Sequence, residues 1–373
     1  MSCPMAMDWP EPIVRVQSLS EMGFSSIPTR YIKPSADRPS LTAGHTSGDA
    51  INIPTIDLEP LLLSSSHVDG GGCTAADTAE VHAQVSAACR SWGFFQVVNH
   101  GVTPELMDRA REVWREFFHL PMEVKQPYAN SPATYEGYGS RIGVEKGAVL
   151  DWSDYFFLNC LPCSLKDHTK WPSLPSSIRE VIEEYSEQMV KLCGELMKIL
   201  SRNLGLKEEV LEDAFGGENI GSCLRANFYP KCPSPGLTLG LSAHSDPGGL
   251  TILLPDQQVS GLQVRQNGEW ITVKPARNAF IVNIGDQIQV LSNGIYKSVE
   301  HRVIVNSEEE RVSLAYFYNP KSDLVIKPVK EIVTPENPAL YPPMTYAEYR
   351  LYMRSKGLKG KSQLQESSSN SAA

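Results

Sequence analysis

His244 and Asp246, separated by one serine, are the residues with the clearest capacity for chemistry in this sequence, together with a distant His301. In an extended segment, residues i and i+2 project to the same side, so His244 and Asp246 can offer an imidazole nitrogen and a carboxylate oxygen to one ion. His301 would complete the set of ligands. Two histidines and one carboxylate on one side of a metal leave positions open for a cosubstrate and O2 on a non-haem Fe(II) ion. Taken alone, His-x-Asp also occurs in solvated turns and helix N-caps.

A second constellation, Arg311-Val-Ser313, lies shortly after His301. The polar residues 307–310 stand between two β-branched runs, a pattern that predicts a hairpin. Antiparallel pairing about that turn would put His301, Val303, Arg311 and Ser313 on one face, so that the metal ligand and the arginine line one cavity. A buried arginine needs an anion, and its fork suits a carboxylate assisted by a serine hydroxyl. The alternative is a surface arginine in a charged hairpin.

With these residues in place, the chain resembles the plant 2-oxoglutarate/Fe(II)-dependent dioxygenases, the soluble class that includes anthocyanidin synthase and the gibberellin oxidases. Matching phrases run through nearly the whole chain: IPTIDL at 53–58, WGFFQVVNHG at 92–101 and YPPMT at 341–345. Two longer runs, EPIVRVQSL at 11–19 and TYEGYGSR at 134–141, are more narrowly similar to the jasmonate-induced oxygenases, which hydroxylate jasmonic acid.

The expected fold is α+β, with a double-stranded β-helix (jelly roll) core braced by helices, a helical or mixed N-terminal region and a C-terminal helix. From Cys223 onward, short β-rich runs are spaced by Gly, Pro and Asn, which is typical of a double-sheet jelly roll. Apolar periodicity and capping residues predict helices at 76–90, from Thr103 to about 120, at 177–203 and at 345–356. Strands are expected at 51–58, 94–98 and 149–158, a loop at 64–72, and irregular chain bordering the substrate opening at 135–147.

Five segments are expected along the chain. These are a partly disordered N-terminal extension (1–50), a mixed α/β region (51–215), the Fe(II)/2-oxoglutarate dioxygenase jelly roll (216–330), the C-terminal helix (331–360) and a disordered Ser-rich tail (361–373).

The resemblance also assigns residues that would hold the cosubstrate. Asn227 and Tyr229 match the family's Asn-x-Tyr motif, in which the tyrosine hydroxyl joins Arg311 and Ser313 at the distal carboxylate of 2-oxoglutarate. By strand alternation Arg225 points to the same side. A buried charge that has lost its partner costs about 3–5 kcal/mol, so Arg225 requires a second anion.

Arg350 and Arg354 are expected to share one face of the terminal helix because they are spaced i and i+4. On their own they read equally well as solvated surface charges. In the resembling enzymes this helix lies across the mouth of the jelly roll, where three arginines would suit a carboxylate on the prime substrate. Phe157 and Phe317, if they face the cavity, would hold an apolar ring; without the resemblance, each reads as plain core.

Bulk properties exclude several classes of partner. The net charge is −9 and no basic block is present, which argues against nucleic acid or an anionic membrane. No apolar run approaches a membrane span and no signal segment opens the sequence, so we expect the protein in the cytoplasm, or alternatively in the nucleus. Separately, we expect it to be a monomer. The eight cysteines are scattered, with Cys160 and Cys163 the only close pair, so reduced thiols are expected rather than a zinc site. His100, at a strand end, is expected to be structural.

The sequence therefore predicts a hydroxylase with Fe(II) on His244, Asp246 and His301, using 2-oxoglutarate and O2, with ascorbate as reductant. By resemblance, the cosubstrate is decarboxylated to succinate while jasmonic acid is converted to 12-hydroxyjasmonic acid, lowering jasmonate signalling. The alternatives are a gibberellin or flavonoid oxidase of the same fold, or a hormone-binding protein without turnover.

Overall fold

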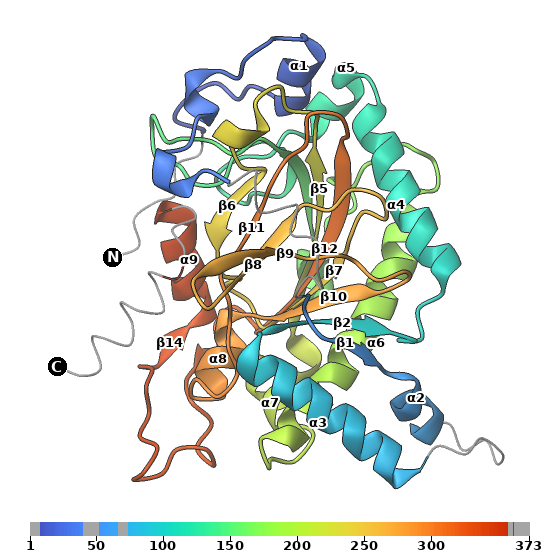
Figure 1. Cartoon of the computed structure of the whole chain (residues 1–373), viewed down its shortest axis with the longest axis vertical. Helices are drawn as coiled ribbons and strands as arrows, with labels where there is room; N and C mark the ends of the chain where they lie inside the picture. Colours follow the sequence, from blue (N-terminus) through green and yellow to red (C-terminus); the bar gives the residue numbers. More distant parts are fainter. Residues whose placement is uncertain (1–7, 40–51, 66–73, 357–360, 362–373) are drawn as a thin grey trace.

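Two β-sheets lie face to face at the centre of the computed structural model, which describes residues 8–39, 52–65, 74–356 and 361 (Figure 1). The larger sheet contains β1 (Thr55–Asp57), β2 (Phe94–Val98), β3 (Gly137–Gly139), β4 (Asp154–Leu161), β5 (Gly221–Tyr229), β7 (Leu250–Leu254), β10 (Phe280–Ile284) and β12 (Arg311–Asn319). The smaller sheet contains β6 (Leu241–His244), β8 (Leu262–Gln266), β9 (Glu269–Thr272) and β11 (His301–Val303).

The strand orders are β1-β2-β10-β7-β12-β5-β4-β3 in the larger sheet and β6-β11-β8-β9 in the smaller one. Neighbours in both sheets run antiparallel, except for the parallel pair of β1 and β2. Strands that follow each other in the chain repeatedly change sheet, as in a jelly roll. A separate pair, β13 (Val325–Ile326) and β14 (Met344–Thr345), leads into the C-terminal helix α9 (Tyr346–Lys356).

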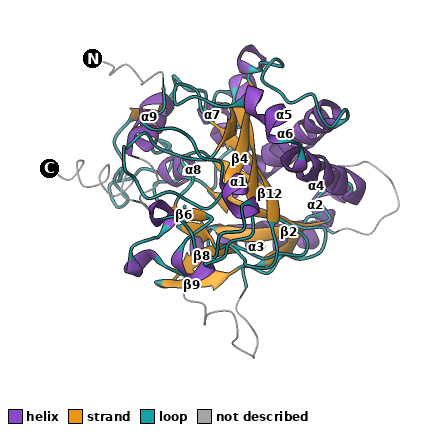
Figure 2. Ribbon diagram, turned by 90° about the horizontal axis from the view of Figure 1, so that it is seen from above, coloured by secondary structure: helices purple, strands orange, loops and turns teal. Residues whose placement is uncertain are grey.

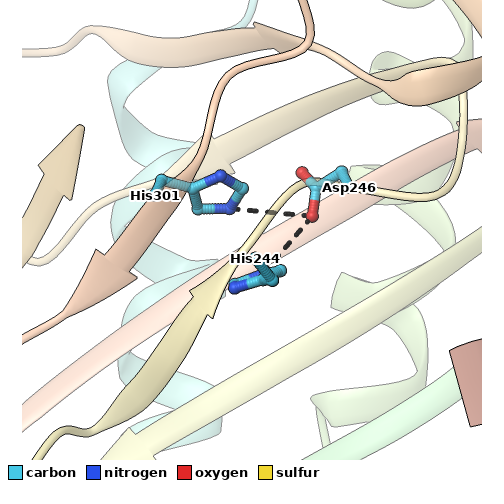
Figure 3. A group of neighbouring side chains, drawn as sticks. All are labelled: His244, Asp246 and His301. Atoms are coloured by element: carbon cyan, nitrogen blue, oxygen red, sulfur yellow. Dashed lines mark ion pairs between the residues drawn. The ribbon is translucent and has the colours of Figure 1, made fainter. Parts of the chain in front are cut away.

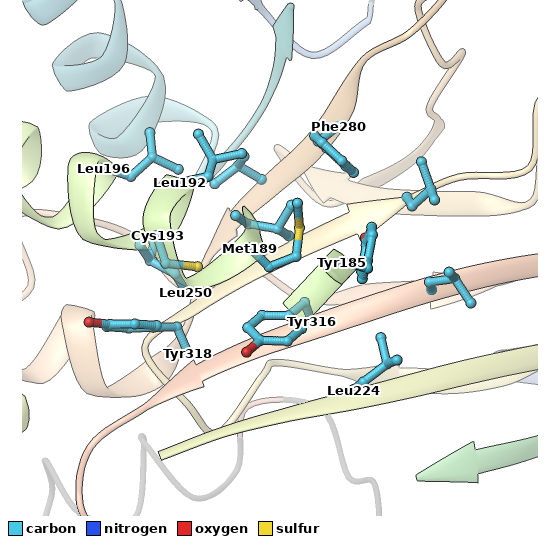
Figure 4. Packing of buried hydrophobic residues seen from close by; sticks show 14 of the residues in the cluster. Tyr185, Met189, Leu192, Cys193, Leu196, Leu224, Leu250, Phe280, Tyr316 and Tyr318 are labelled. Atoms are coloured by element: carbon cyan, nitrogen blue, oxygen red, sulfur yellow. The ribbon is translucent and has the colours of Figure 1, made fainter. Parts of the chain in front are cut away.

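Helices α3 (Ala75–Ser91), α4 (Pro104–His119) and α6 (Ile178–Asn203) cover the outer side of the larger sheet. The apolar stripe of α6, which includes Tyr185, Met189 and Leu196, packs on strand residues such as Leu250 and Tyr316 (Figure 4). Figure 2 shows α4 and α6 on one side of the strands and α9 on the other. The predicted helices at 76–90 and 177–203 are confirmed to within one residue at each end.

The start of α4 follows the predicted capping pattern. The Thr103 hydroxyl accepts a hydrogen bond from the Leu106 amide, and Pro104 occupies the first helical position. The shorter helices are α1 (Val16–Glu21), α2 (Glu59–Ser65), α5 (Met122–Lys125), α7 (Val210–Phe215) and α8 (Asp286–Leu291), with 3-10 turns η1 (Thr29–Tyr31), η2 (Ser35–Asp37), η4 (Gln126–Tyr128), η5 (Cys163–Leu165), η6 (Gly217–Asn219) and η7 (Pro235–Leu237).

The N-terminal extension is more ordered than its weak periodicity predicts over residues 8–39. The fully buried Asp154 accepts hydrogen bonds from the amides of Val16 and Gln17, at 3.0 and 2.8 Å, which fixes the first turn of α1. Tyr31 packs edge-on against Trp152 in a second core. The remaining expectations of disorder, at 1–7, 40–50 and the tail beyond Lys361, lie outside the described residues.

Several predicted boundaries differ from the structure. The first strand is limited to Thr55–Asp57, and the strand expected at 149–158 is shifted to Asp154–Leu161. Residues 149–153 do not join the sheet because the amides of Leu150 and Trp152 bond to loop carbonyls of Arg30 and Leu239. In the loop expected at 64–72, α2 extends to Ser65 and residues 66–73 lie outside the description; the irregular stretch 135–147 contains the short strand β3.

The hairpin predicted between His301 and Arg311 is wrong. Strand β11 pairs with β6 and β8, whereas β12 pairs with β5 and β7, so the two strands belong to different sheets. The polar turn does form, with the Asn306 side chain accepting from the amides of Glu308 and Glu309, but it carries the chain across from one sheet to the other. Because the two sheets face each other, His301 and Arg311 still point into the same interior.

His100 has the structural role expected of it. Its Nε2 donates to the Asn278 carbonyl oxygen at 3.0 Å, and its Nδ1 accepts from the Val102 amide at 3.2 Å. Cys160 is buried and Cys163 exposed, and both are free thiols. The division of the chain into five segments stays a prediction; the main core is shared between helices of the 51–215 region and strands of the 216–330 region.

Candidate active site

The side chains of His244, Asp246 and His301 point toward one another (Figure 3). His244 ends β6 and His301 opens β11, and the two residues are direct partners in the antiparallel ladder. The Nε2 atoms of His244 and His301 lie 3.6 and 3.7 Å from Oδ1 of Asp246. All three side chains are buried, and within the described part of the chain they are the only cluster of this kind with metal-ligand spacing.

Hydrogen bonds orient each of these side chains for a metal. The Nδ1 atoms of His244 and His301 donate to the carbonyl oxygens of Ser242 and Val299, at 2.8 and 3.2 Å, which leaves the two Nε2 lone pairs facing Asp246. Thr251 and Asn283 supply the corresponding support for the carboxylate. The Thr251 hydroxyl and the Asn283 amide donate to Oδ2 of Asp246 at 2.6 and 2.8 Å, so Oδ1 remains available.

The protonation states also suit a metal. Burial, followed by the proximity of His301, lowers the pKa of His244 to about 4, so its imidazole is neutral near pH 7. Burial alone would raise the pKa of Asp246, but the neighbouring imidazoles and the hydrogen bonds from Thr251 and Asn283 outweigh it and hold the pKa below its ordinary value. Two imidazoles and one carboxylate fit Fe(II), which when bound supplies open coordination positions for a keto acid and O2.

A cavity of about 220 Å³ opens beside these residues, between the two sheets. Alternation along β5 and β12 turns every second residue of each strand into it. Arg311 stands opposite Tyr229, and Ser313 opposite Asn227, in the β12–β5 ladder. These four predicted cosubstrate residues all line the cavity.

Arg311 is buried and lines the cavity. Its Nη1 donates to the Ser313 hydroxyl at 3.3 Å, while its Nε is buried without a hydrogen-bond partner in the described structure. Leaving a charged donor unsatisfied is costly, whereas a carboxylate in the cavity would accept two parallel hydrogen bonds from the fork. The arrangement at this end of the cavity is therefore suited to an anion.

Arg225 presents a second cation to the same cavity, further along β5. Its guanidinium carbon lies 4.2 Å from the centre of the Tyr155 ring, and its Nε is likewise buried without a partner among the described residues. In the ladder Arg225 stands between Phe157 of β4 and Ala315 of β12. Phe157 and, two positions beyond Ala315, Phe317 line the cavity, as predicted.

Helix α9 closes the cavity with Arg350. The guanidinium carbon of Arg350 lies 5.6 Å from the centre of the Tyr346 ring, and both residues line the cavity. Arg225, from the middle of the sequence, and Arg350, from near its C-terminal end, thus line the same cavity. Arg354 is in the same helix, but its side chain lies outside the described residues, so its predicted role is not tested.

Sequence reasoning did not identify Thr251, Asn283, Tyr155 or Tyr346 as parts of the site. A signal existed for Asn283, because it is a single amide inside the apolar strand β10, and a buried polar group requires a partner. The contributions of Thr251 and Tyr155 depend on which strands become neighbours, which local patterns do not reveal.

Two family comparisons cover most of the chain. Residues 220–320 match the 2OG-Fe(II) oxygenase superfamily, and residues 53–175 match the N-terminal region described as that of the non-haem dioxygenase in morphine synthesis. The chain belongs to the 2OG-Fe(II) oxygenase superfamily. As a member it is a dioxygenase that uses Fe(II), 2-oxoglutarate and O2, with the jelly-roll core expected from the sequence.

Relatives within this superfamily match along nearly their full lengths. Jasmonate-induced oxygenase 2 of Arabidopsis thaliana is 64% identical over 96% of this chain and 94% of its own. Codeine O-demethylase of Papaver somniferum is 40% identical over 94% of each chain. A crystal structure of JOX2 in complex with 2OG, Fe and JA superposes with a TM-score of 0.88 at 63% identity, covering 96% of this chain and 99% of the other.

Among the described residues, no helix combines the length and the apolar character that a membrane span requires.

Proposed function

We propose that this dioxygenase hydroxylates jasmonic acid to 12-hydroxyjasmonic acid and thereby lowers jasmonate signalling. His244, Asp246 and His301 hold the Fe(II). Arg311, with Ser313 and Tyr229, receives the distal carboxylate of 2-oxoglutarate. The observation that carries the proposal is the second cation of the cavity wall, Arg225, whose Nε is buried without a hydrogen-bond partner among the described residues and calls for an anion other than the cosubstrate.

The shape and polarity of the cavity support a substrate with one acidic end and an apolar body. Arg225 and Arg350 contribute positive charge to the wall, while Phe157, Phe317 and aliphatic residues such as Leu253 contribute apolar surface. Jasmonic acid has this division between a carboxylate and an apolar ring. The 64% identity to jasmonate-induced oxygenase 2, and the likeness to a structure of JOX2 that contains JA, support the same choice.

A gibberellin oxidase is the second candidate, because gibberellins also carry a carboxylate that Arg225 and Arg350 could bind. Neutral flavonoids fit less well, since they would leave the guanidinium of Arg225, whose Nε is buried, without an anion. We also propose that the enzyme is a monomer and acts in the cytosol or nucleus on small molecules alone. Size-exclusion chromatography with light scattering tests whether it is a monomer.

The deciding experiment incubates the purified protein with Fe(II), ascorbate and 2-oxoglutarate, together with jasmonic acid, a gibberellin or a flavonoid in separate reactions. We expect jasmonic acid to gain one oxygen atom, with succinate formed in equal amount, and the other two to change little. Products are measured by mass spectrometry. Oxygenation of the gibberellin but not of jasmonic acid would transfer the assignment to the second candidate, and binding of jasmonic acid without any product would favour a non-catalytic role.

A further inference from the structure

The loop that carries Asp246, residues 245–249, is held by hydrogen bonds from the start of α8. The amide of Asp286 donates to the Asp246 carbonyl oxygen at 2.8 Å, and the amide of Gln287 donates to the Gly248 carbonyl oxygen at 2.9 Å. The contact leaves no room for adjustment, since a Cβ atom on Gly285 would lie 2.3 Å from the Gly248 carbonyl oxygen. The position of the metal-binding loop therefore depends on where α8 sits.

The side chain of Asp286 joins this loop to the C-terminal helix. Its Oδ2 accepts a hydrogen bond from the hydroxyl of Ser245, at 3.1 Å, and another from the hydroxyl of Tyr349 on α9, at 2.7 Å. Ser245 stands between the two ligands His244 and Asp246. Asp286 and Tyr349 are only 1% and 5% exposed, so water does not readily replace either bond.

Tyr349 is also the immediate neighbour of Arg350, whose side chain faces the cavity. A second hydrogen bond, from the Tyr346 hydroxyl to Oδ1 of Asn319 at 2.9 Å, attaches the first turn of α9 to β12. Loss of the Tyr349 hydroxyl would therefore change the position of α9, while the Tyr346 hydrogen bond would keep the helix attached to β12. It would also leave Asp286 with one fewer donor, at the point where α8 meets the metal-binding loop.

We infer that Tyr349 is a positioning residue that, through Asp286, links the helix bearing Arg350 to the loop bearing Asp246. Arg350, the proposed cation for the prime substrate, and the metal-binding carboxylate of Asp246 then both depend on the hydrogen bonds of Asp286. Loss of these hydrogen bonds therefore weakens binding at both sites. The substrate half of this inference rests on the proposed function of Arg350; the metal half does not.

Tyr349→Phe tests the link, and Tyr341→Phe provides a matched control. The Tyr341 hydroxyl accepts a hydrogen bond from Nε2 of Gln289 at 2.8 Å, so it too joins the C-terminal segment to α8, but at a residue that does not contact the metal-binding loop. Each variant removes one phenol hydroxyl. The measurements are the affinity for Mn(II) with 2-oxoglutarate present, by calorimetry, and the affinity for jasmonic acid, by the same method, with thermal unfolding recorded for both proteins.

We expect Tyr349→Phe to raise the dissociation constants of Mn(II) and of jasmonic acid by about three- to tenfold, less than the 10–100-fold typical of groups bonded directly to metal ligands. Tyr341→Phe should stay within about twofold of the wild type for both. Unchanged Mn(II) affinity in Tyr349→Phe overturns the inference, as do equal losses in the two variants. If the wild type does not oxidise jasmonic acid, the proposed substrate is wrong, but the Mn(II) comparison still decides whether the link exists.

Discussion

Arg311 and Tyr229 lie directly opposite each other on β12 and β5, with the guanidinium carbon 5.1 Å from the centre of the tyrosine ring. Two positions further along the same ladder, Ser313 stands opposite Asn227. The proposed cosubstrate site is therefore built on two paired strands of the larger sheet, where the ladder between β12 and β5 fixes the spacing of the two backbones. Its geometry should respond to changes in side-chain shape more than to changes in charge.

Arg311→Lys tests that expectation. Lysine keeps the positive charge but loses the planar fork, so one of two parallel hydrogen bonds to the carboxylate is lost. A charge-assisted hydrogen bond contributes about 1.5–3 kcal/mol. We therefore expect the KM for 2-oxoglutarate to rise by at least about tenfold, while the KM for jasmonic acid changes little. Succinate formation at varied concentrations of each compound measures both. A rise confined to the KM for jasmonic acid would show that Arg311 does not anchor the cosubstrate.

Alanine in place of His244, Asp246 or His301 is expected to abolish turnover and to leave the fold intact. Each residue would be one of only three protein ligands to the metal. Calorimetric titration with Mn(II), alongside circular dichroism, separates loss of metal from loss of structure. Wild-type Mn(II) affinity in any of the three variants would contradict the assignment of that ligand.

Thr251→Val removes the 2.6 Å hydrogen bond to Oδ2 of Asp246 while keeping nearly the same volume. Because such supporting bonds orient the ligand, we expect metal affinity to fall by about 10–100-fold. Thr251→Ser is the control, since it retains the hydroxyl and should stay much closer to the wild type. Equal affinities in the valine and serine variants would mean that Asn283 alone is sufficient to hold the carboxylate.

The sequence was informative about the site because its residues alternate along single strands. Arg225, Asn227 and Tyr229 share a face of β5 whatever strands lie beside it, and so do Arg311 and Ser313 on β12. The long helix α6 was predictable for a similar reason, since its apolar stripe is a local pattern. His301 and Arg311 line one cavity as expected, but for a different reason: β11 and β12 are adjacent in sequence and belong to two facing sheets instead of pairing with each other.

What could not be predicted depends on contacts between distant segments. Asp154 is a single carboxylate at the start of a strand, and nothing local indicates that it binds the amides of Val16 and Gln17 far upstream. The hydrogen bond between Asp286 and Tyr349 likewise joins segments that come together only in the folded chain. Such bonds order the N-terminal segment and position α9, whose Tyr346 and Arg350 line the cavity.

His100 should make the stability of the protein depend on pH. Burial lowers its pKa in the folded state, and protonation would also destroy the acceptor that Nδ1 presents to the Val102 amide. The unfolded chain takes up the proton near the ordinary pKa of about 6.5, so the free energy of unfolding should fall as pH drops below that value and be insensitive to His100 above it.

The expected contribution of His100 is at most about 1.4 kcal/mol per pH unit. Comparison of wild type and His100→Gln by urea unfolding at pH 7.5, 6.5 and 5.5 isolates it, because the other histidines are common to both proteins. The variant should be less stable at pH 7.5 but lose less stability on acidification. Parallel curves would show that His100 is not the group responsible.

The proposed role of Arg225 and Arg350 is tested by removing charge either from the protein or from the substrate. If Arg225 and Arg350 bind the carboxylate of jasmonic acid, changing either to alanine should weaken that substrate by about 1.5–3 kcal/mol. Methyl jasmonate keeps the ring and side chain but has no charge, so it should be a correspondingly poor substrate for the wild type. In the arginine variants its disadvantage should largely disappear, since a neutral ester loses little when the cation is gone. Competition between acid and ester in one reaction, read by mass spectrometry, gives the ratio of kcat/KM values directly; equal oxidation of both by the wild type would mean that neither arginine recognises the carboxylate.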